Sequence, residues 1–309
     1  MNNTAKYLGL FLTLTFGYSV IAQTAGSDIW LGHFKSKGAT ETIEDAEIKW
    51  AQITNKPDYH NQPYFHLKSN SLLYTAMVDQ KQTDIFRYDL HTGLTNNLTR
   101  SDESEYSPTV MPNMTGLSGI IVDEKGKQWL WQWSLSGKSK GRLLAAEPIG
   151  YHVWLNDSEV LTFVLGKQQE PVHTLQRFTV NSSNTLGEVI DKHIGASLWP
   201  IPKSAGFSYS RTVDSEHQLM MYQPKSSNTT YLTNLPSSSA YYAWTPDGYA
   251  VTPESSGKDN AQSKLIAWSM EAQQWQPYLD LGEKCASGIS RLAFSDDYKY
   301  IAVVCNRKQ

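Results

Sequence analysis

The sequence predicts an all-β protein, a β-propeller of six four-stranded antiparallel blades, on three observations. Residues 61–99 contain four short extended runs separated by turn residues, which is the pattern of an antiparallel meander. Similar groups of runs recur at intervals of roughly forty to fifty residues, the spacing of propeller blades. The last group stops after two runs, and the chain before the first group supplies two more, so both ends together would make one blade.

The repeat at residues 61–99 gives the clearest strands. Its second run, residues 72–78 (LLYTAMV), is apolar nearly throughout, as expected for a strand buried on both faces. The third run, residues 83–89, carries Ile85 and Tyr88 at irregular positions, so it is assigned as a strand from its context. One such sheet is too small to bury its own faces, and neighbouring sheets are therefore required.

Five further repeats follow in the same order of strands and turns. They begin near residues 105, 151, 197, 241 and 289. The sixth contains only two predicted strands, residues 289–294 and 300–304, before the sequence stops.

The amino-terminal segment would complete this last blade. Residues 27–34 (SDIWLGHF) have the form of the third strand of the first repeat, and residues 40–54 would supply a fourth strand. Closing the ring in this way removes exposed sheet edges. Residues 41–52 have an alternative, because Ile43, Ala46 and Trp50 could line one face of a short helix.

Two turns and one strand resemble the repeats of TolB-type propellers. Residues 244–248 (WTPDG) and 294–297 (FSDD) look like the S-P-D-G turn of that repeat, and residues 83–89 followed by Leu98-Thr99 resemble its D-I-Y-x-x-D…L-T half. The resemblance covers nearly all of the chain after residue 22 and implies an exported six-bladed propeller. TolB itself also carries a separate amino-terminal α/β domain, and we expect this chain to differ there because it has no room for one. Such propellers occur in binding proteins and as accessory domains of enzymes. The resemblance therefore implies an architecture and does not imply an activity.

The first residues predict a secretory leader. Residues 1–22 carry Lys6, a mostly apolar run and a small-residue cleavage site at Val20-Ile21-Ala22, which leaves residues 23–309 as a single domain. A membrane anchor is the alternative, but the apolar run falls short of the roughly twenty residues that a bilayer span requires. No later stretch approaches that length, so we expect a periplasmic or secreted protein without a membrane span after leader cleavage.

Composition limits the partners. Charged residues make up 18% and the net charge is -3, which gives no electrostatic footprint for nucleic acid. Aromatic residues at 12%, including ten Trp, suit sheets stacked around an axis, where large rings fill the wedge between neighbours.

Two cysteines, Cys285 and Cys305, remain after the leader. An oxidising compartment permits a bridge between them. In the last predicted hairpin, however, Cys305 falls opposite Gly288, so a bridge requires the preceding loop to fold back. A disulfide and two unpaired thiols therefore remain alternatives. There is no Cys-x-x-Cys and no nearby His to suggest a metal site.

The starts of the innermost strands converge on the central channel of a propeller, and the candidate site residues lie there. They are His60, Asn61, Glu105, Tyr106, His152, Tyr241 and Arg291. Imidazoles, a carboxylate, a guanidinium and phenols at similar depth could form a mouth that holds a small ligand or a peptide end. The structural alternative is that these groups hydrogen-bond one another and water.

The sequence contains no complete catalytic motif. The spacing Gly-x-Ser-x-Gly occurs at residues 137–141 (GKSKG), but no α/β half follows to hold a catalytic triad. A His-Glu-x-x-His pair and a phosphate-binding glycine loop are missing, so no cofactor is predicted. We predict a non-catalytic scaffold for a protein or peptide. The alternative is a hydrolase or metal-dependent enzyme at the channel mouth, working through His60, Glu105, His152 and Arg291.

Overall fold

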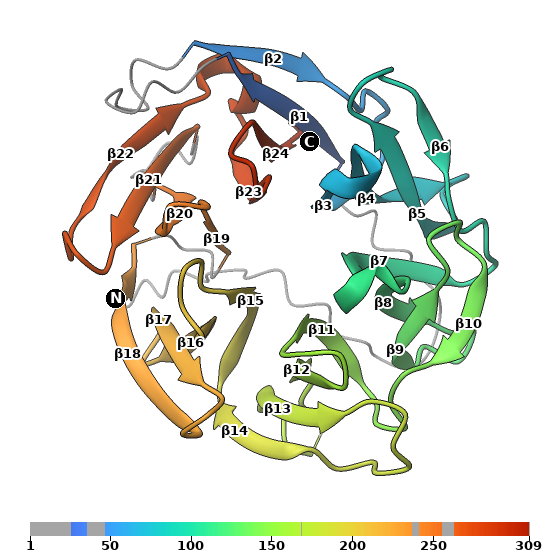
Figure 1. Cartoon of the computed structure of the whole chain (residues 1–309). Coiled ribbons are helices and arrows are strands. Elements are labelled where there is room, and N and C mark those ends of the chain that lie inside the picture. The colour runs from blue at the N-terminus through green and yellow to red at the C-terminus, as the bar shows by residue number, and fades with distance from the viewer. Residues whose placement is uncertain (1–25, 36–46, 168, 237–240, 255–262, 309) are drawn as a thin grey trace, which may run out of the picture.

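The computed structural model describes residues 26–35, 47–167, 169–236, 241–254 and 263–308. These residues form six four-stranded antiparallel sheets arranged as the blades of a ring (Figure 1). The predicted fold class is therefore confirmed. The predicted leader, residues 1–22, lies outside the described residues. Among the described residues, no helix has the length and apolar character needed to cross a membrane.

Five blades are built from consecutive strands, with the first strand innermost. They comprise β3 (His60–His66), β4 (Ser71–Val78), β5 (Gln82–Asp89) and β6 (Thr95–Asn97); β7 (Ser104–Val110), β8 (Leu117–Val122), β9 (Gln128–Trp133) and β10 (Ser139–Arg142); β11 (Ile149–Trp154), β12 (Glu159–Val164), β13 (Thr174–Thr179) and β14 (Glu188–Lys192); β15 (Ile194–Pro200), β16 (Phe207–Val213), β17 (Glu216–Gln223) and β18 (Asn228–Leu235); and β19 (Ala243–Trp244), β20 (Tyr249–Pro253), β21 (Lys264–Ser269) and β22 (Trp275–Asp280).

The closing blade combines both ends of the chain. Its strands are β23 (Ile289–Phe294), β24 (Tyr300–Asn306), β1 (Ser27–Phe34) and β2 (Ile48–Gln52), in that order from the channel outward. In Figure 1 the dark blue β1 lies beside the red β24. The two pair antiparallel, from Ser27 opposite Asn306 to His33 opposite Tyr300. Residues 48–52 are a strand, as predicted, and residues 36–46 lie outside the described residues.

Local turn chemistry ends the strands where the sequence predicts. Asn70 adopts a left-handed conformation (φ 50°) after the short 3-10 helix η2 (Leu67–Ser69), and asparagine tolerates this region better than most residues. In the TolB-like turns, the hydroxyls of Thr245 and Ser295 accept hydrogen bonds from the amides of Tyr249 (3.0 Å) and Tyr300 (2.9 Å). Each hydroxyl also donates to the aspartate two residues further on. These bonds close the tight connection between the first and second strands of a blade.

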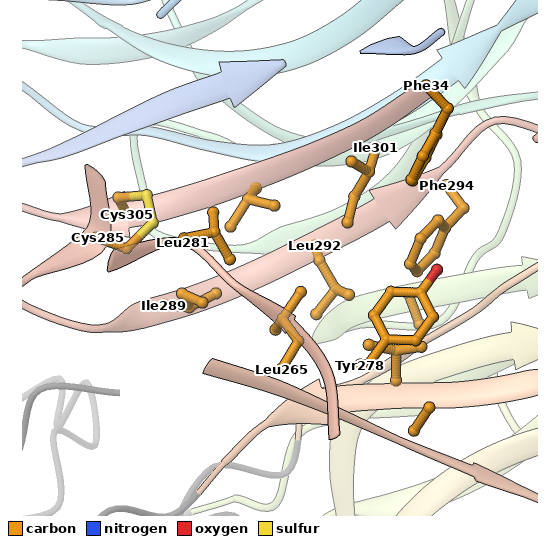
Figure 2. Close-up of a cluster of buried hydrophobic side chains, with 14 residues drawn as sticks. Phe34, Leu265, Tyr278, Leu281, Cys285, Ile289, Leu292, Phe294, Ile301 and Cys305 are labelled. Carbon is orange, nitrogen blue, oxygen red and sulfur yellow. A yellow bond between two sulfur atoms is a disulfide. The ribbon is translucent and has the colours of Figure 1, made fainter. Parts of the chain in front are cut away.

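The closing blade packs against the fifth blade through a cluster of buried apolar side chains (Figure 2). Leu265 and Tyr278 come from the fifth blade, and Leu292 and Ile301 from the closing blade. Burying each side chain of this size stabilises the fold by about 1.5–3 kcal/mol. This contact holds the two halves of the closing blade in the ring.

Cys285 and Cys305 form a disulfide at one end of that cluster (Figure 2). Cys305 pairs with Ile289 in the sheet, and the 3-10 helix η4 (Gly282–Cys285) folds the chain back toward it. The two Cα atoms come within 4.8 Å of each other as a result. Because η4 turns the chain back, Cys285 comes close enough to Cys305 for a disulfide, which a flat hairpin would not allow.

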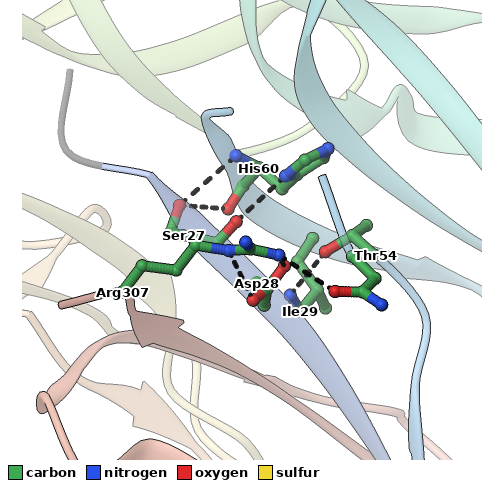
Figure 3. A network of polar contacts seen from close by, with 7 residues as sticks. Ser27, Asp28, Ile29, Thr54, His60 and Arg307 are labelled. Carbon is green, nitrogen blue, oxygen red and sulfur yellow. Dashed lines mark hydrogen bonds and ion pairs between the residues drawn. The ribbon is translucent and has the colours of Figure 1, made fainter. Parts of the chain in front are cut away.

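Polar contacts join the closing blade to the first blade, and within the closing blade they join β1 to the residue that follows β24 (Figure 3). Ser27 Oγ donates to the carbonyl oxygen of His60 (2.7 Å), and His60 Nδ1 lies 2.9 Å from the carbonyl oxygen of Ser27. Arg307, just after β24, meets Asp28 of β1 in two places: Nε lies 2.7 Å from Oδ2, and Nη2 donates to Oδ1 at 2.8 Å. The amino-terminal strand is therefore fixed on both sides by side chains.

Candidate functional site

A cavity of about 270 Å³ lies in the central channel. All six innermost strands contribute to its wall, together with the turns after β15 and β23. In five of these strands the lining begins only at the third or fourth residue, for example at Gln62 in β3 and at Arg291 in β23. The cavity therefore occupies the part of the channel toward the carboxyl-terminal ends of the innermost strands.

Irregular register in the innermost strands decides which side chains reach this cavity. The pairing shifts between Asn61 and Tyr64 in β3, and at the matching place in β7. Gln62 and Ser107 lie at these shifts with φ of 57° and 54°, and each precedes a proline, which cannot donate to a sheet ladder. Gln62 Oε1 accepts hydrogen bonds from the amide of Ser107 (2.7 Å) and from Thr75 Oγ1 (2.9 Å). This side chain links the first two blades at the cavity wall.

Arg291 and two tyrosines form the polar base of the cavity. Arg291 Nη2 donates to the phenol oxygen of Tyr151 at 2.7 Å. Its Cζ atom lies 3.9 Å from the ring centroid of Tyr241 and 5.2 Å from that of Tyr151, so the guanidinium is held by the electron-rich faces of both rings. Tyr241 and Gln62 also hydrogen-bond the Tyr151 phenol.

Burial and the Arg291 charge shift the pKa values of the phenols at this base in different directions. Burial opposes the charge on Arg291, but the phenols of Tyr151, Tyr241 and Tyr59 raise its pKa above the ordinary value. Burial likewise opposes ionisation of Tyr151, yet the Arg291 charge and the hydrogen bonds to the phenol outweigh it and lower the Tyr151 pKa. The pKa values of Tyr59 and Tyr241 are instead raised, chiefly by burial. Tyr151 is thus the phenol of this group that ionises most readily.

Aromatic and proline side chains form the walls above the base. The aromatic ones are Tyr64, Phe65, Trp154, Trp199, Tyr242, Trp244 and Phe294, and the prolines are Pro63, Pro108, Pro200 and Pro202. Two of the indoles are oriented by serines of the preceding blade: Trp154 Nε1 donates to Ser118 Oγ (2.9 Å), and Trp244 Nε1 donates to Ser208 Oγ (2.7 Å). Walls of this kind favour an apolar portion of a ligand.

His152 is a buried, neutral member of the wall. Its side chain is 7% exposed, and burial lowers the pKa of its imidazole to about 3. Nε2 lies 2.7 Å from Ser118 Oγ, whereas Nδ1 has no hydrogen-bond partner. Ser107 Oγ, also in the lining, is a second buried polar atom without a partner.

Asp296 is the acidic side chain of the cavity lining, and it lies at the other end from Arg291. It belongs to the turn after β23, five residues further along the chain than Arg291. Because β23 runs along the channel between them, Arg291 and Asp296 lie at different depths. Burial raises the Asp296 pKa, and the neighbouring Asp297 adds to that shift. The cavity therefore has a cation at its base and a carboxyl group at its rim.

Three of the seven predicted site residues, His152, Tyr241 and Arg291, line the cavity. The other four lie outside its lining. His60 is buried at the joint between the first and closing blades, and Asn61 is buried beside it with Oδ1 accepting from the Gln62 amide (2.8 Å). Tyr106 packs edge-to-face on Tyr59, with 6.5 Å between ring centroids.

Glu105, the fourth, is fully buried between the first and second blades. Its carboxylate accepts hydrogen bonds from Ser101 Oγ (2.8 Å) and Thr99 Oγ1. Burial raises the Glu105 pKa to about 7, although these hydrogen bonds act in the opposite direction. Through these hydrogen bonds Glu105 stabilises the loop between β6 and β7, and it does not line the channel cavity.

Several lining residues were not among the predicted site residues. Gln62 and Ser107 carried a usable signal, because a proline inside a strand marks a bulge that redirects neighbouring side chains. Tyr151 directly precedes the predicted His152, but its pairing with Arg291 across the ring had no local signature. No cluster of three or more potential metal ligands occurs within the part of the chain that the structure describes.

Comparisons with known proteins show a shared fold. No protein-family model matches this chain, and no curated protein sequence is similar to it. A TolB protein from Agrobacterium tumefaciens superposes with a TM-score of 0.68 at 13% identity, covering 93% of this chain and 100% of that one. TolB from Acinetobacter baumannii gives 0.54 at 13% identity, over 91% of this chain and 64% of that one. An oligogalacturonate lyase in complex with manganese gives 0.55 at 14% identity, over 84% and 80%. The resemblance to TolB-type propellers is thus supported at the level of fold.

Proposed function

We propose that this chain is an exported, non-catalytic propeller that binds a protein or peptide in the periplasm through its central cavity. The observation that carries this proposal is the cavity itself, with a polar base around Arg291 and walls of aromatic and proline side chains. Its volume of about 270 Å³ is just below the roughly 300–1,000 Å³ range of ligand pockets. Such a space admits a side chain or chain end of a partner, not a folded domain.

Two further features support an exported binding protein. The first residues have the composition of a secretory leader, and the Cys285–Cys305 disulfide suits an oxidising compartment. The closed ring arranges six innermost strands around one axis, an arrangement that would pre-organise the lining side chains for a ligand.

The experiment compares capture by matched variants. Immobilised mature protein is exposed to periplasmic extract, captured proteins are identified by mass spectrometry, and binding of each purified candidate is then measured. Trp199→Ala removes an indole from the cavity wall, and Trp131→Ala makes the same change on the outer part of the second blade. We expect Trp199→Ala to weaken binding at least about tenfold and Trp131→Ala to leave it unchanged. Equal affinities in all three proteins would contradict a cavity site.

An enzyme working in the cavity is the second candidate, and the Tyr151 phenol favours it. Its pKa is lowered and it lies beside Arg291, an arrangement that would let a phenolate remove a proton next to a substrate carboxylate. One protein of similar fold is an oligogalacturonate lyase. Of the four residues predicted for an enzyme, His152 and Arg291 line the cavity, whereas His60 and Glu105 do not. Formation of unsaturated product from oligogalacturonate, lost in Tyr151→Phe, would favour this candidate over the first.

A further inference from the structure

Arg291 places a positive charge in the channel without a carboxylate to balance it. The ionisable groups that raise its pKa are the phenols of Tyr151, Tyr241 and Tyr59, and no carboxyl group of the described residues is among them. The acidic side chain of the cavity lining, Asp296, belongs to the turn beyond the end of β23 and is not among the groups that shift the Arg291 pKa. A guanidinium withdrawn from water is costly unless an anion compensates it, so the base of the cavity is suited to an anionic group.

The kind of anion follows from the donors at the base. A guanidinium presents a planar fork of N–H groups that fits the two oxygens of a carboxylate. A single cation surrounded by phenols matches a group with one negative charge, whereas phosphate and sulfate sites collect more positive charge or several backbone amides. The base therefore favours a carboxylate.

The group attached to that carboxylate must suit the walls. The lining combines the indoles of Trp154, Trp199 and Trp244 and several prolines with hydrogen-bonding side chains. The indole and proline surfaces suit an apolar group attached to the carboxylate. Two lining residues nevertheless have a buried polar atom without a partner, His152 Nδ1 and Ser107 Oγ. Unpaired buried polar atoms are uncommon in proteins, and a ligand with an amide group next to its apolar part could pair with them.

The charge at the rim sets the direction of entry. Asp296 would repel a second carboxylate at the cavity mouth, whereas the charge of Arg291 attracts one at the base. A ligand with its only carboxylate at one end and a neutral chain behind it satisfies both conditions.

From these observations we infer that the cavity takes the C-terminal end of a peptide whose last residue is apolar or aromatic, with the terminal carboxylate on Arg291. This inference rests on the proposed function and names the part of the partner that would enter the cavity. The chemistry that it requires is a carboxylate on an apolar group next to an amide.

The test compares a free acid with its amide. The probes are N-acetyl-Ala-Ala-Phe with a free carboxylate, the same peptide with a C-terminal amide, and N-acetyl-Ala-Ala-Asp; calorimetry and tryptophan fluorescence report binding. We expect the Phe acid to bind at least about tenfold more tightly than its amide, since a charge-assisted hydrogen bond is lost in the amide. The Asp peptide should bind more weakly than the Phe acid, because it carries a second carboxylate.

Two variants of Arg291 and one matched control complete the test. Arg291→Gln should abolish the preference for acid over amide, and Arg291→Lys should retain a reduced preference because the charge remains. Arg142→Gln removes another arginine that stacks on an aromatic ring, Trp129 at 4.6 Å, but lies outside the cavity lining, and it should change nothing. Thermal unfolding of each variant confirms folding. If Arg291→Gln does not fold, the comparison of acid with amide on the wild-type chain decides alone.

The outcomes separate this inference from the function on which it rests. Equal binding of acid and amide, both weakened by Trp199→Ala, would overturn the inference while supporting a peptide site in the cavity. Binding of digalacturonate without binding of the Phe acid would overturn it as well, because a hydroxylated uronate would then be the source of the carboxylate. A captured partner that depends on Trp199 but whose C-terminal amide binds as well as the acid would leave only the proposed function standing.

Discussion

The phenol oxygen of Tyr151 lies 2.7 Å from Nη2 of Arg291, although the two residues are 140 positions apart. Tyr151 belongs to the innermost strand of the third blade and Arg291 to that of the closing blade, so the contact spans the channel between opposite blades. It forms only when the ring is closed. Formation of the Tyr151–Arg291 contact at the cavity base therefore depends on completion of the closing blade.

The Tyr151 phenol should ionise before the other tyrosines of the channel. The Arg291 charge and the hydrogen bonds to the phenol lower its pKa, whereas burial raises the pKa values of Tyr59 and Tyr241. Ultraviolet titration of tyrosinate absorbance measures this. The earliest step of the titration should vanish in Tyr151→Phe and move to higher pH in Arg291→Gln. A first step that survives Tyr151→Phe would show that another phenol carries it.

Carboxylate affinity should fall as the pH rises through the Tyr151 pKa. The phenolate formed above that pKa competes with the ligand for Arg291 and repels it, while the neutral phenol below that pKa does not. The other ionisable groups around Arg291 are Tyr59 and Tyr241, whose pKa values are raised, so they stay neutral over this range. Calorimetry of the Phe acid at several pH values should show this decline in the wild type and a flat profile in Tyr151→Phe.

Removing the disulfide should lower the free energy of unfolding. The bridge closes a loop between residues 20 positions apart, and the loss of that constraint on the unfolded chain is worth about 3 kcal/mol. Urea unfolding of the Cys285→Ala, Cys305→Ala double variant measures the change. Adding a reductant should destabilise the wild type by a similar amount and leave the double variant unaffected; equal sensitivity of both proteins would contradict the assignment.

Glu105 should make the protein less stable as the pH rises from its unfolded pKa to its folded one. Burial raises the folded pKa to about 7, against roughly 4.3 in an unfolded chain. Between these values the folded state holds a proton that the unfolded state releases, so the free energy of unfolding falls with pH, by at most about 4 kcal/mol. Glu105→Gln removes the titration.

Urea unfolding at about pH 5 and about pH 8 compares the two proteins. The stability of Glu105→Gln relative to the wild type should increase from the lower pH to the higher. A constant difference between the two proteins would mean that Glu105 does not titrate in this interval.

The ion pair between Asp28 and Arg307 should stabilise the attachment of β1. Both side chains are largely buried and make two close contacts, 2.7 and 2.8 Å. A double-mutant cycle with Asp28→Asn and Arg307→Gln should give a coupling energy of about 1–2 kcal/mol. Lys35 and Glu47, an exposed pair in the same blade, serve as the control and should couple more weakly. Equal coupling in both pairs would show that burial adds nothing.

The ring was predictable from the sequence because its signals are local. Apolar runs such as residues 72–78 and hydroxyl–aspartate turns such as the one at Thr245 specify strands and their connections within a few residues. Completion of the last blade by residues 27–34 followed from counting strands, and the pairing of β1 with β24 confirms it. The fold was therefore accessible without long-range information.

The site was less accessible, because long-range contacts decide it. Prolines follow Gln62 and Ser107, where the register of two innermost strands shifts and the cavity lining begins, two and three residues beyond the strand starts. Glu105 turns between blades because Ser101 and Thr99 bind its carboxylate there. His60 bonds Ser27 of the closing blade instead of facing the cavity. None of these partners is recognisable from the local pattern of the strand.

The composition of the closing blade has a consequence for biosynthesis. During translation β1 is made before every other described strand and β24 after all of them, yet β1 takes its inner hydrogen-bond partner from β24. Throughout elongation β1 has to remain without that neighbour, with its apolar residues unpaired in the sheet. A chain released before residue 300 would lack β24 and could not complete the ring. Correct assembly therefore requires that synthesis has included β24.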